Sequence, residues 1–125
     1  MHILYVEDNP LVREVTAELL ADDGRNIVAM ESAEEALHEF RASSYDMVIT
    51  DVSLPVMSGM DLARTLLHER PTLPIIIASG YSLDIGLEKW GRNVRAIIKP
   101  FESEEINALI GELAPPRRPG GDSQP

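Results

Sequence analysis

Five short, continuously apolar runs alternate with longer amphipathic segments along this chain, and this alternation constrains the fold more than any other feature. The runs do not alternate polar with apolar residues, which is typical of strands buried on both faces of a parallel sheet. They cover residues 3–6, 27–30, 47–49, 75–78 and 96–98. With 125 residues, the chain has the length of one domain with one core.

The segments between the runs carry helical start signals. Asn9 is a favourable cap before Pro10, Ser32 and Glu35 form a capping box, and Ser58 is a further cap. Helices are therefore expected over residues 10–22, 33–42, 59–69 and 103–113. In the first of them, apolar residues recur at four-residue steps, the spacing of one helix face. These residues are Leu11, Val15 and Leu19.

Two segments depart from the helical pattern. The stretch 81–93 contains Gly86 and Gly91 and has poor helical spacing, so we expect a short or mobile fourth helix there. Residues 114–125 are rich in proline and glycine and offer no core residues, which predicts a disordered tail after a domain at 1–113.

Five strands with intervening helices give a (βα)5 order. Because crossovers between parallel strands are right-handed, this order predicts an α/β fold with a doubly wound, five-stranded parallel sheet. In such sheets the functional site lies beyond the C-terminal ends of the strands, where the strand order reverses. The residues at those ends are therefore the candidates for function.

The charge of the chain limits its partners. Its net charge is −10, with 21 acidic residues against 11 lysines and arginines, which argues against a nucleic-acid binder and against an anionic membrane surface. There is no cysteine, and no apolar run approaches the ~20 residues of a membrane span. A soluble cytoplasmic protein is the default expectation.

Charged and polar side chains stand at the ends of four predicted strands. They are Glu7, Asp8, Asp51, Ser79 and Lys99. Three neighbouring carboxylates repel one another, and a hard divalent cation such as Mg²⁺ relieves that repulsion. The Lys99 ammonium is suited to neutralise an anion, Ser79 offers a hydroxyl, and Gly80 allows close approach of a backbone N–H. These are the parts needed to hold a phosphoryl group on a carboxylate.

In this order and spacing, these features resemble the receiver domain of two-component response regulators, which has a flavodoxin-like fold. The resemblance runs from about Met1 to Leu113 and is carried by "VEDNP", "TDVSLPVMSGMDL", "IIIASGY" and "AIIKPF". It implies that Asp51 is the phosphoacceptor and that Ser79 and Lys99 contact the phosphoryl oxygens. It also implies a cis bond between Lys99 and Pro100.

The same resemblance implies a metal site. Asp8, Asp51 and the backbone carbonyl of Ser53 would bind Mg²⁺, and Glu7 would act mainly through the water shell of the ion. The family's phosphodonor is a histidine kinase or a histidine phosphotransfer protein. The expected function is therefore that of a stand-alone receiver, a Mg²⁺-dependent switch that catalyses only its own phosphorylation and dephosphorylation. Its output would be an altered protein–protein contact, or it would pass phosphoryl groups along a relay.

One family feature is missing. Many receivers carry Tyr or Phe three residues before the lysine, where this chain has Ala96. "IIIASGY" is similar to a subgroup of single-domain receivers with a Phe-Ala-Thr-Gly-Tyr-like motif, which also tend to lack that aromatic residue. We therefore hypothesise that Tyr81 and the segment to Gly91 perform the switching, which NMR shifts of residues 80–92 on phosphorylation would test.

Other functions compete with this one. A degenerate receiver would bind a partner without phosphorylation, and the chain would also fit a fragment of a larger regulator or hybrid kinase. A haloacid dehalogenase-like hydrolase needs a second acid two residues after the nucleophile, where Ser53 stands. A flavodoxin-like cofactor carrier needs a phosphate-cradling loop, but "EDNPLVRE" is acidic. The histidines show no ligand spacing and are expected at the surface: His2, His38 and His68.

Overall fold

The computed structural model describes residues 1–21, 24–81 and 87–114. Strands and helices alternate along these parts of the chain, as predicted. The strands are β1 (His2–Val6), β2 (Asn26–Met30), β3 (Met47–Asp51), β4 (Ile75–Ser79) and β5 (Val94–Ile98). The helices are α1 (Pro10–Leu20), α2 (Ala33–Ala42), α3 (Gly59–Glu69) and α4 (Ser103–Leu113), with a short 3₁₀ helix, η1 (Leu87–Trp90), before β5.

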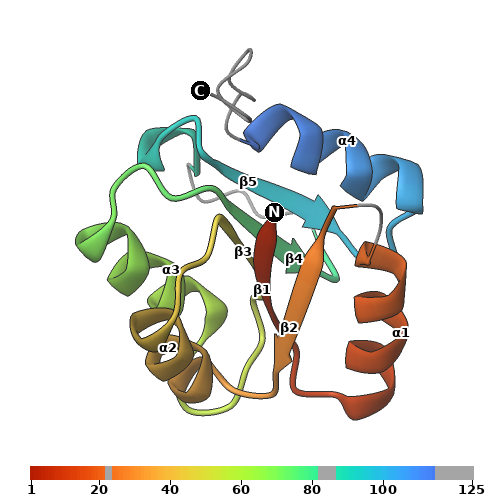
Figure 1. The fold of residues 1–125 in the computed structure, drawn as a ribbon, viewed down its shortest axis with the longest axis horizontal. Coiled ribbons are helices and arrows are strands. Elements are labelled where there is room, and N and C mark those ends of the chain that lie inside the picture. The colour runs from red at the N-terminus through yellow and green to blue at the C-terminus, as the bar shows by residue number, and fades with distance from the viewer. Residues whose placement is uncertain (22–23, 82–86, 115–125) are drawn as a thin grey trace.

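The five strands form one parallel sheet in the order β2-β1-β3-β4-β5. Helices α2 and α3 cover one face of the sheet and α1 and α4 cover the other (Figure 1). This arrangement confirms the predicted doubly wound fold. The strand order reverses between β1 and β3, so the C-terminal ends of these two strands frame the switch point.

Two hydrophobic cores, one on each face, hold the sheet between its helices. Every residue of β3 and β4 is buried. Alternate residues of a strand serve opposite faces: Ile75 and Ile77 pack on the α2–α3 side and Ile76 on the α1–α4 side. Each fully buried isoleucine contributes roughly 1.5–3 kcal/mol. The continuously apolar runs follow from this double coverage.

The predicted helix caps are present. The side chain of Asn9 accepts hydrogen bonds from two backbone N–H groups in the first turn of α1. Ser32 and Ser58 each accept one, at the starts of α2 and α3. These bonds satisfy donors that have no partner within the helix. They fix where each helix leaves the C-terminal edge of the sheet.

Helix α1 packs differently from the predicted apolar stripe. Leu11 is 70% exposed and Val15 56% exposed, whereas Leu20 is fully buried. Steps of four residues overshoot the 3.6-residue turn, so such a stripe drifts around the helix and leaves the packing face. The helix ends at Leu20 with Ala21 as its C-cap, and the last residue of the predicted helix, 22, lies outside the described residues.

The fourth helix is short, as the sequence indicated: η1 has four residues and is followed by Gly91 in a left-handed conformation, with φ 123°. Trp90 packs against the α2–α3-side core, and the Arg64 guanidinium lies 5.1 Å from its ring centroid. On β5, Ala96 and Ile98 are exposed. The rest of the predicted switching segment, 82–86, and the predicted tail from 115 lie outside the described residues.

Within the described parts of the chain, no helix combines the length and the apolar character that crossing a membrane requires.

Candidate functional site

Three carboxylates meet where β1 and β3 end. Glu7 directly follows β1, and Asp51 is the last residue of β3. One oxygen atom from each of Glu7, Asp8 and Asp51 lies within 4.8 Å of the others. Glu7 and Asp51 are buried and Asp8 is exposed, so the group opens to solvent on the side of Asp8. The structure thus brings together the three acids that the sequence placed at strand ends.

Lys99 connects two of these acids. Its Nζ lies 3.0 Å from Oε1 of Glu7 and 3.4 Å from Oδ1 of Asp51. Burial lowers the pKa of Lys99, but the hydrogen bond to Glu7 and the charge of Asp51 outweigh burial, so its pKa is raised above the ordinary value. Lys99 therefore stays charged and offsets part of the repulsion between the acids.

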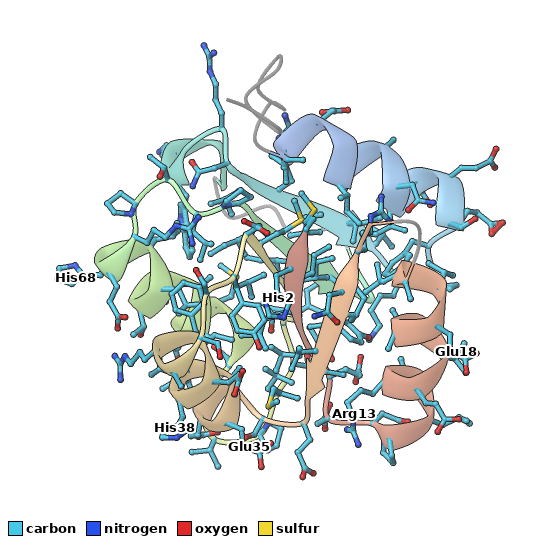
Figure 2. All side chains as sticks on the ribbon, viewed as in Figure 1. His2, Arg13, Glu18, Glu35, His38 and His68 are labelled. Atoms are coloured by element: carbon cyan, nitrogen blue, oxygen red, sulfur yellow. The ribbon has the colours of Figure 1, made fainter. Side chains whose placement is uncertain are left out.

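Arg13 and Asn9 hold the acidic loop in place. Nη1 of Arg13 donates hydrogen bonds to the backbone carbonyls of Glu7 at 2.9 Å and Asp8 at 3.3 Å. The backbone N–H of Asn9 donates to Oε2 of Glu7 at 3.1 Å. Arg13 lies in the first turns of α1, beside the C-terminal end of the sheet (Figure 2). These roles were not predicted from the sequence, although a basic residue in the helix that follows an acidic strand end is a usable signal.

Gly59 shapes the backbone of the phosphoacceptor candidate. A Cβ atom at Gly59 would collide with the carbonyl oxygen of Asp51, and the N–H of Gly59 donates to the carbonyl of Val52 at 3.0 Å. The Thr50 hydroxyl donates to the same Asp51 carbonyl at 3.0 Å. The first turn of α3 is thereby pressed against the end of β3, which fixes the direction of the Asp51 side chain.

Ser79 lies at the end of β4 and is 1% exposed. Its hydroxyl accepts a hydrogen bond from the backbone N–H of Tyr81 at 3.2 Å. The N–H of Lys99 donates to the carbonyl of Ser79, which ties the ends of β4 and β5 together. Gly80 is exposed, and a Cβ there would meet nothing within 4 Å. Packing within the protein therefore does not require glycine at this position, and the close approach of the Gly80 N–H to a phosphoryl group stays a prediction.

The remaining predicted residues are placed as follows. The bond between Lys99 and Pro100 is cis, as predicted. Ser53 is exposed in the loop after β3, and Tyr81 is 62% exposed. The role of the Ser53 carbonyl as a ligand stays a prediction.

The three histidines lie far from one another (Figure 2). His38 and His68 are exposed, as expected. His2 is half-buried and not fully exposed as expected, and its ring stacks on Tyr45 with ring centroids 4.3 Å apart. Its Nδ1 is 2.8 Å from the carbonyl of Ser44, so its role is packing at the N-terminal end of the sheet.

The carboxylate group suits a hard cation. Three carboxylate oxygens within 4.8 Å provide the ligand type that Mg²⁺ and Ca²⁺ prefer, and the exposed Asp8 leaves room for water ligands. The acidic cluster can thus hold a metal ion.

Comparison with known proteins identifies the family. The family model described as "Response regulator receiver domain" matches residues 3–111. The chain belongs to this family. It is a receiver domain of the two-component type, and receiver domains act with histidine kinases or phosphotransfer proteins.

Relatives cover most of the domain. The chain is 32% identical over 121 residues to the two-component response regulator PhoP of Pseudomonas aeruginosa, covering 90% of this chain and 51% of PhoP. It is 31% identical over 126 residues to the cell cycle transcriptional regulator CtrA of Caulobacter vibrioides, covering 99% of this chain and 54% of CtrA. The chain therefore spans only about half the length of these curated relatives.

Solved structures agree with the fold. The response regulator TrrA of Thermotoga maritima, crystallised in complex with Mg²⁺–BeF, superimposes with a TM-score of 0.80 at 32% identity, over 90% of this chain and 97% of that chain. A receiver domain protein from Clostridium thermocellum also gives 0.80 at 28% identity, over 90% and 92% of the two chains.

Proposed function

We propose that Asp51 accepts a phosphoryl group from a histidine kinase or a histidine phosphotransfer protein in a Mg²⁺-dependent reaction. The observation that carries this proposal is the meeting of three carboxylates within 4.8 Å, with the ammonium of Lys99 3.4 Å from Asp51. A buried ion-pair cluster costs desolvation energy, so such a group at the switch point favours a functional role over a structural one.

In the proposed reaction, a carboxylate oxygen of Asp51 attacks the phosphorus of phosphohistidine. A new O–P bond forms, and the P–N bond breaks with its electron pair going to the imidazole nitrogen of the donor. Mg²⁺ would be held by Asp8, Asp51 and the Ser53 carbonyl, and Glu7 would act mainly through the water shell of the ion. The bound ion would neutralise charge on the phosphoryl oxygens. The chain's own residues position and stabilise that group.

Two side chains are proposed to contact the phosphoryl group. Lys99 is bound to Glu7 and Asp51, and its flexible stem allows the ammonium to turn to a phosphoryl oxygen once negative charge is added to Asp51. The hydroxyl of Ser79 accepts from the Tyr81 N–H, so its own hydrogen is free to donate to a phosphoryl oxygen. Both groups come from strand ends at the same edge of the sheet.

The output is proposed to be a changed protein–protein contact. The chain would catalyse only its own phosphorylation and dephosphorylation, and it would act in the cytoplasm, where its phosphodonors present their phosphohistidine. Its net charge of −10 favours a protein partner over nucleic acid for this domain.

The test is the intact mass of the protein after incubation with Mg²⁺ and acetyl phosphate. A single phosphoryl adduct is expected, absent without Mg²⁺ and absent in Asp51→Asn. Asp61→Asn is the matched control, since Asp61 is an exposed acid on α3 paired with Arg64, and it should be phosphorylated like the wild type. If the wild type binds Mg²⁺ but forms no adduct with any donor, the domain is a degenerate receiver that binds its partner without phosphorylation.

A further inference from the structure

A cavity of about 410 Å³ lies between α1, the sheet and the segment after β5, on the side of the sheet that α1 and α4 cover. Val12, Val15 and Leu19 of α1 form one wall. Tyr5 of β1 and Ala78 of β4 form the floor, and Phe101 lies opposite α1. Most of the surface that lines the cavity is apolar, in contrast to the neighbouring cluster of carboxylates at Glu7, Asp8 and Asp51.

The cavity exists for two reasons that can be read from the chain. First, β4 carries three isoleucines and then Ala78, so the strand offers its smallest side chain where the floor lies. Secondly, α1 is turned so that Leu20 packs fully while Val15, which lines the cavity, stays exposed, so the helix does not fill the space beside it. Because Val15 is an exposed residue of the lining, this space is accessible from solvent and a ligand can enter it.

Besides the carboxylates of Glu7 and Asp51, two hydroxyls and one ammonium reach this apolar space. The hydroxyl of Thr16 comes from α1, and the ammonium of Lys99 stands at one end. The Tyr5 side chain is 3% exposed and is hydrogen-bonded to the side chain of Thr16. Apolar walls with a few convergent polar groups are the usual composition of a small-molecule site.

Charge and size restrict the ligand. Glu7 and Asp51 stand at the Lys99 end of the cavity and already pair with that lysine, so an anionic ligand would meet two carboxylates. The volume lies at the lower part of the ~300–1,000 Å³ typical of small-ligand pockets. A partner helix, ~10–12 Å across, does not fit inside such a space.

We propose that this cavity binds a small neutral molecule with an apolar body and one hydrogen-bonding group, which lies within reach of Tyr5 and Thr16. The binding needs neither Mg²⁺ nor a phosphoryl group, so it can be measured on the unphosphorylated protein, apart from the test of Asp51. Because Lys99 and Asp51 line one end, an occupant would be coupled to the state of the phosphorylation site, and such coupling is reciprocal.

The test uses the neutral fluorophore N-phenyl-1-naphthylamine, which has two aromatic groups and one N–H. Titration of the protein, without Mg²⁺ or phosphodonor, is expected to show saturable binding to one site. Thr16→Phe fills the cavity and should weaken binding about tenfold or more. Thr65→Phe is the matched control, because Thr65 is a half-buried threonine on α3 that lies outside the cavity lining, and its affinity should equal that of the wild type.

Circular dichroism establishes that each variant is folded, and Val12→Phe replaces Thr16→Phe if the latter does not fold. Amide signals of Ala78 and Leu19 should shift during the titration if the probe enters the cavity. The proposal is overturned if the wild type shows no saturable binding, or if a folded cavity-filling variant binds the probe as well as the wild type does. Neither result bears on phosphorylation of Asp51, which is measured separately by mass.

Discussion

At the level of single residues, the acidic site is stable only because each buried charge has a partner. Glu7 is 3% exposed and accepts hydrogen bonds from Lys99 and from the backbone of Asn9. Asp51 is 7% exposed and lies 3.4 Å from the same lysine. Removing one partner of a buried charge pair leaves the other charge uncompensated. The site is therefore expected to tolerate the loss of Lys99 poorly.

Gly59 gives a test of how the Asp51 backbone is held. Gly59→Ala places a methyl group against the Asp51 carbonyl, and backbone on both sides limits relaxation. We expect a loss of about 1–3 kcal/mol in the free energy of unfolding, together with weaker Mg²⁺ binding, because Asp51 must move. Urea unfolding and Mg²⁺ titration measure the two effects.

The control for this substitution is Gly111→Ala in α4. A Cβ at Gly111 meets nothing within 4 Å, and alanine is the better helix former, so stability should rise by about 0.5–1 kcal/mol with Mg²⁺ binding unchanged. If Gly59→Ala were as stable as the wild type, close approach to Asp51 would not be the reason for glycine at this position.

At the level of secondary structure, the sequence predicted most elements because their signals are local. Strand runs such as 75–78 are continuously apolar, and the caps Asn9, Ser32 and Ser58 mark helix starts within a residue. The ends of strands were predicted less well. The apolar run was expected at 96–98, but β5 begins at Val94, because the polar Arg95 interrupts the apolar run within the strand. Convergence of the acids followed from topology, because parallel strands end at one edge.

Other features depend on packing between elements and could not be predicted. The rotation of α1, which exposes Leu11 and Val15, is set by the sheet below it and not by its own periodicity. The bonds from Arg13 to two carbonyls and the contact of Gly59 with Asp51 join atoms that only the folded chain brings together. Sequence spacing identified the chemical groups of the site, and tertiary structure supplied their supports.

The segment after β4 is where switching is expected. Ala96 replaces the aromatic residue that many receivers use, and Tyr81 is 62% exposed with its N–H bonded to the Ser79 hydroxyl. A phosphoryl group that accepts a hydrogen bond from the Ser79 hydroxyl would change the surroundings of the Tyr81 N–H bonded to that oxygen. NMR shifts across residues 80–92 should therefore change when acetyl phosphate and Mg²⁺ are added, and should stay constant in Asp51→Asn. Unchanged shifts in phosphorylated wild-type protein would place the switch elsewhere.

For the molecule as a whole, stability at high pH depends on groups that keep their protons longer when folded. Burial raises the pKa of Tyr5 to about 12. Burial and the hydrogen bond to Glu39 raise the pKa of Tyr45, and the pKa of Lys99 is raised as well. Each of these three groups therefore loses its proton at a lower pH in the unfolded chain than in the folded protein. Their contribution to the free energy of unfolding is complete below about pH 10 and is lost as the pH rises through the pKa of the folded state.

Tyr5→Phe removes one of these ionisable groups and tests whether burial of its phenol contributes to the loss of stability at high pH. The phenol pKa is 10.0 in a free side chain and about 12 in the folded protein, so at about pH 11 the wild type loses about 1 kcal/mol through Tyr5 that the variant does not lose. Urea unfolding at about pH 8 and about pH 11 should show a smaller drop for Tyr5→Phe. Tyr81→Phe, which changes an exposed ring, should drop as the wild type does. An equal drop in Tyr5→Phe and the wild type would mean that the Tyr5 phenol is not protected from ionisation by burial, and alkaline unfolding would then depend on Tyr45, Lys99 and the net charge of −10.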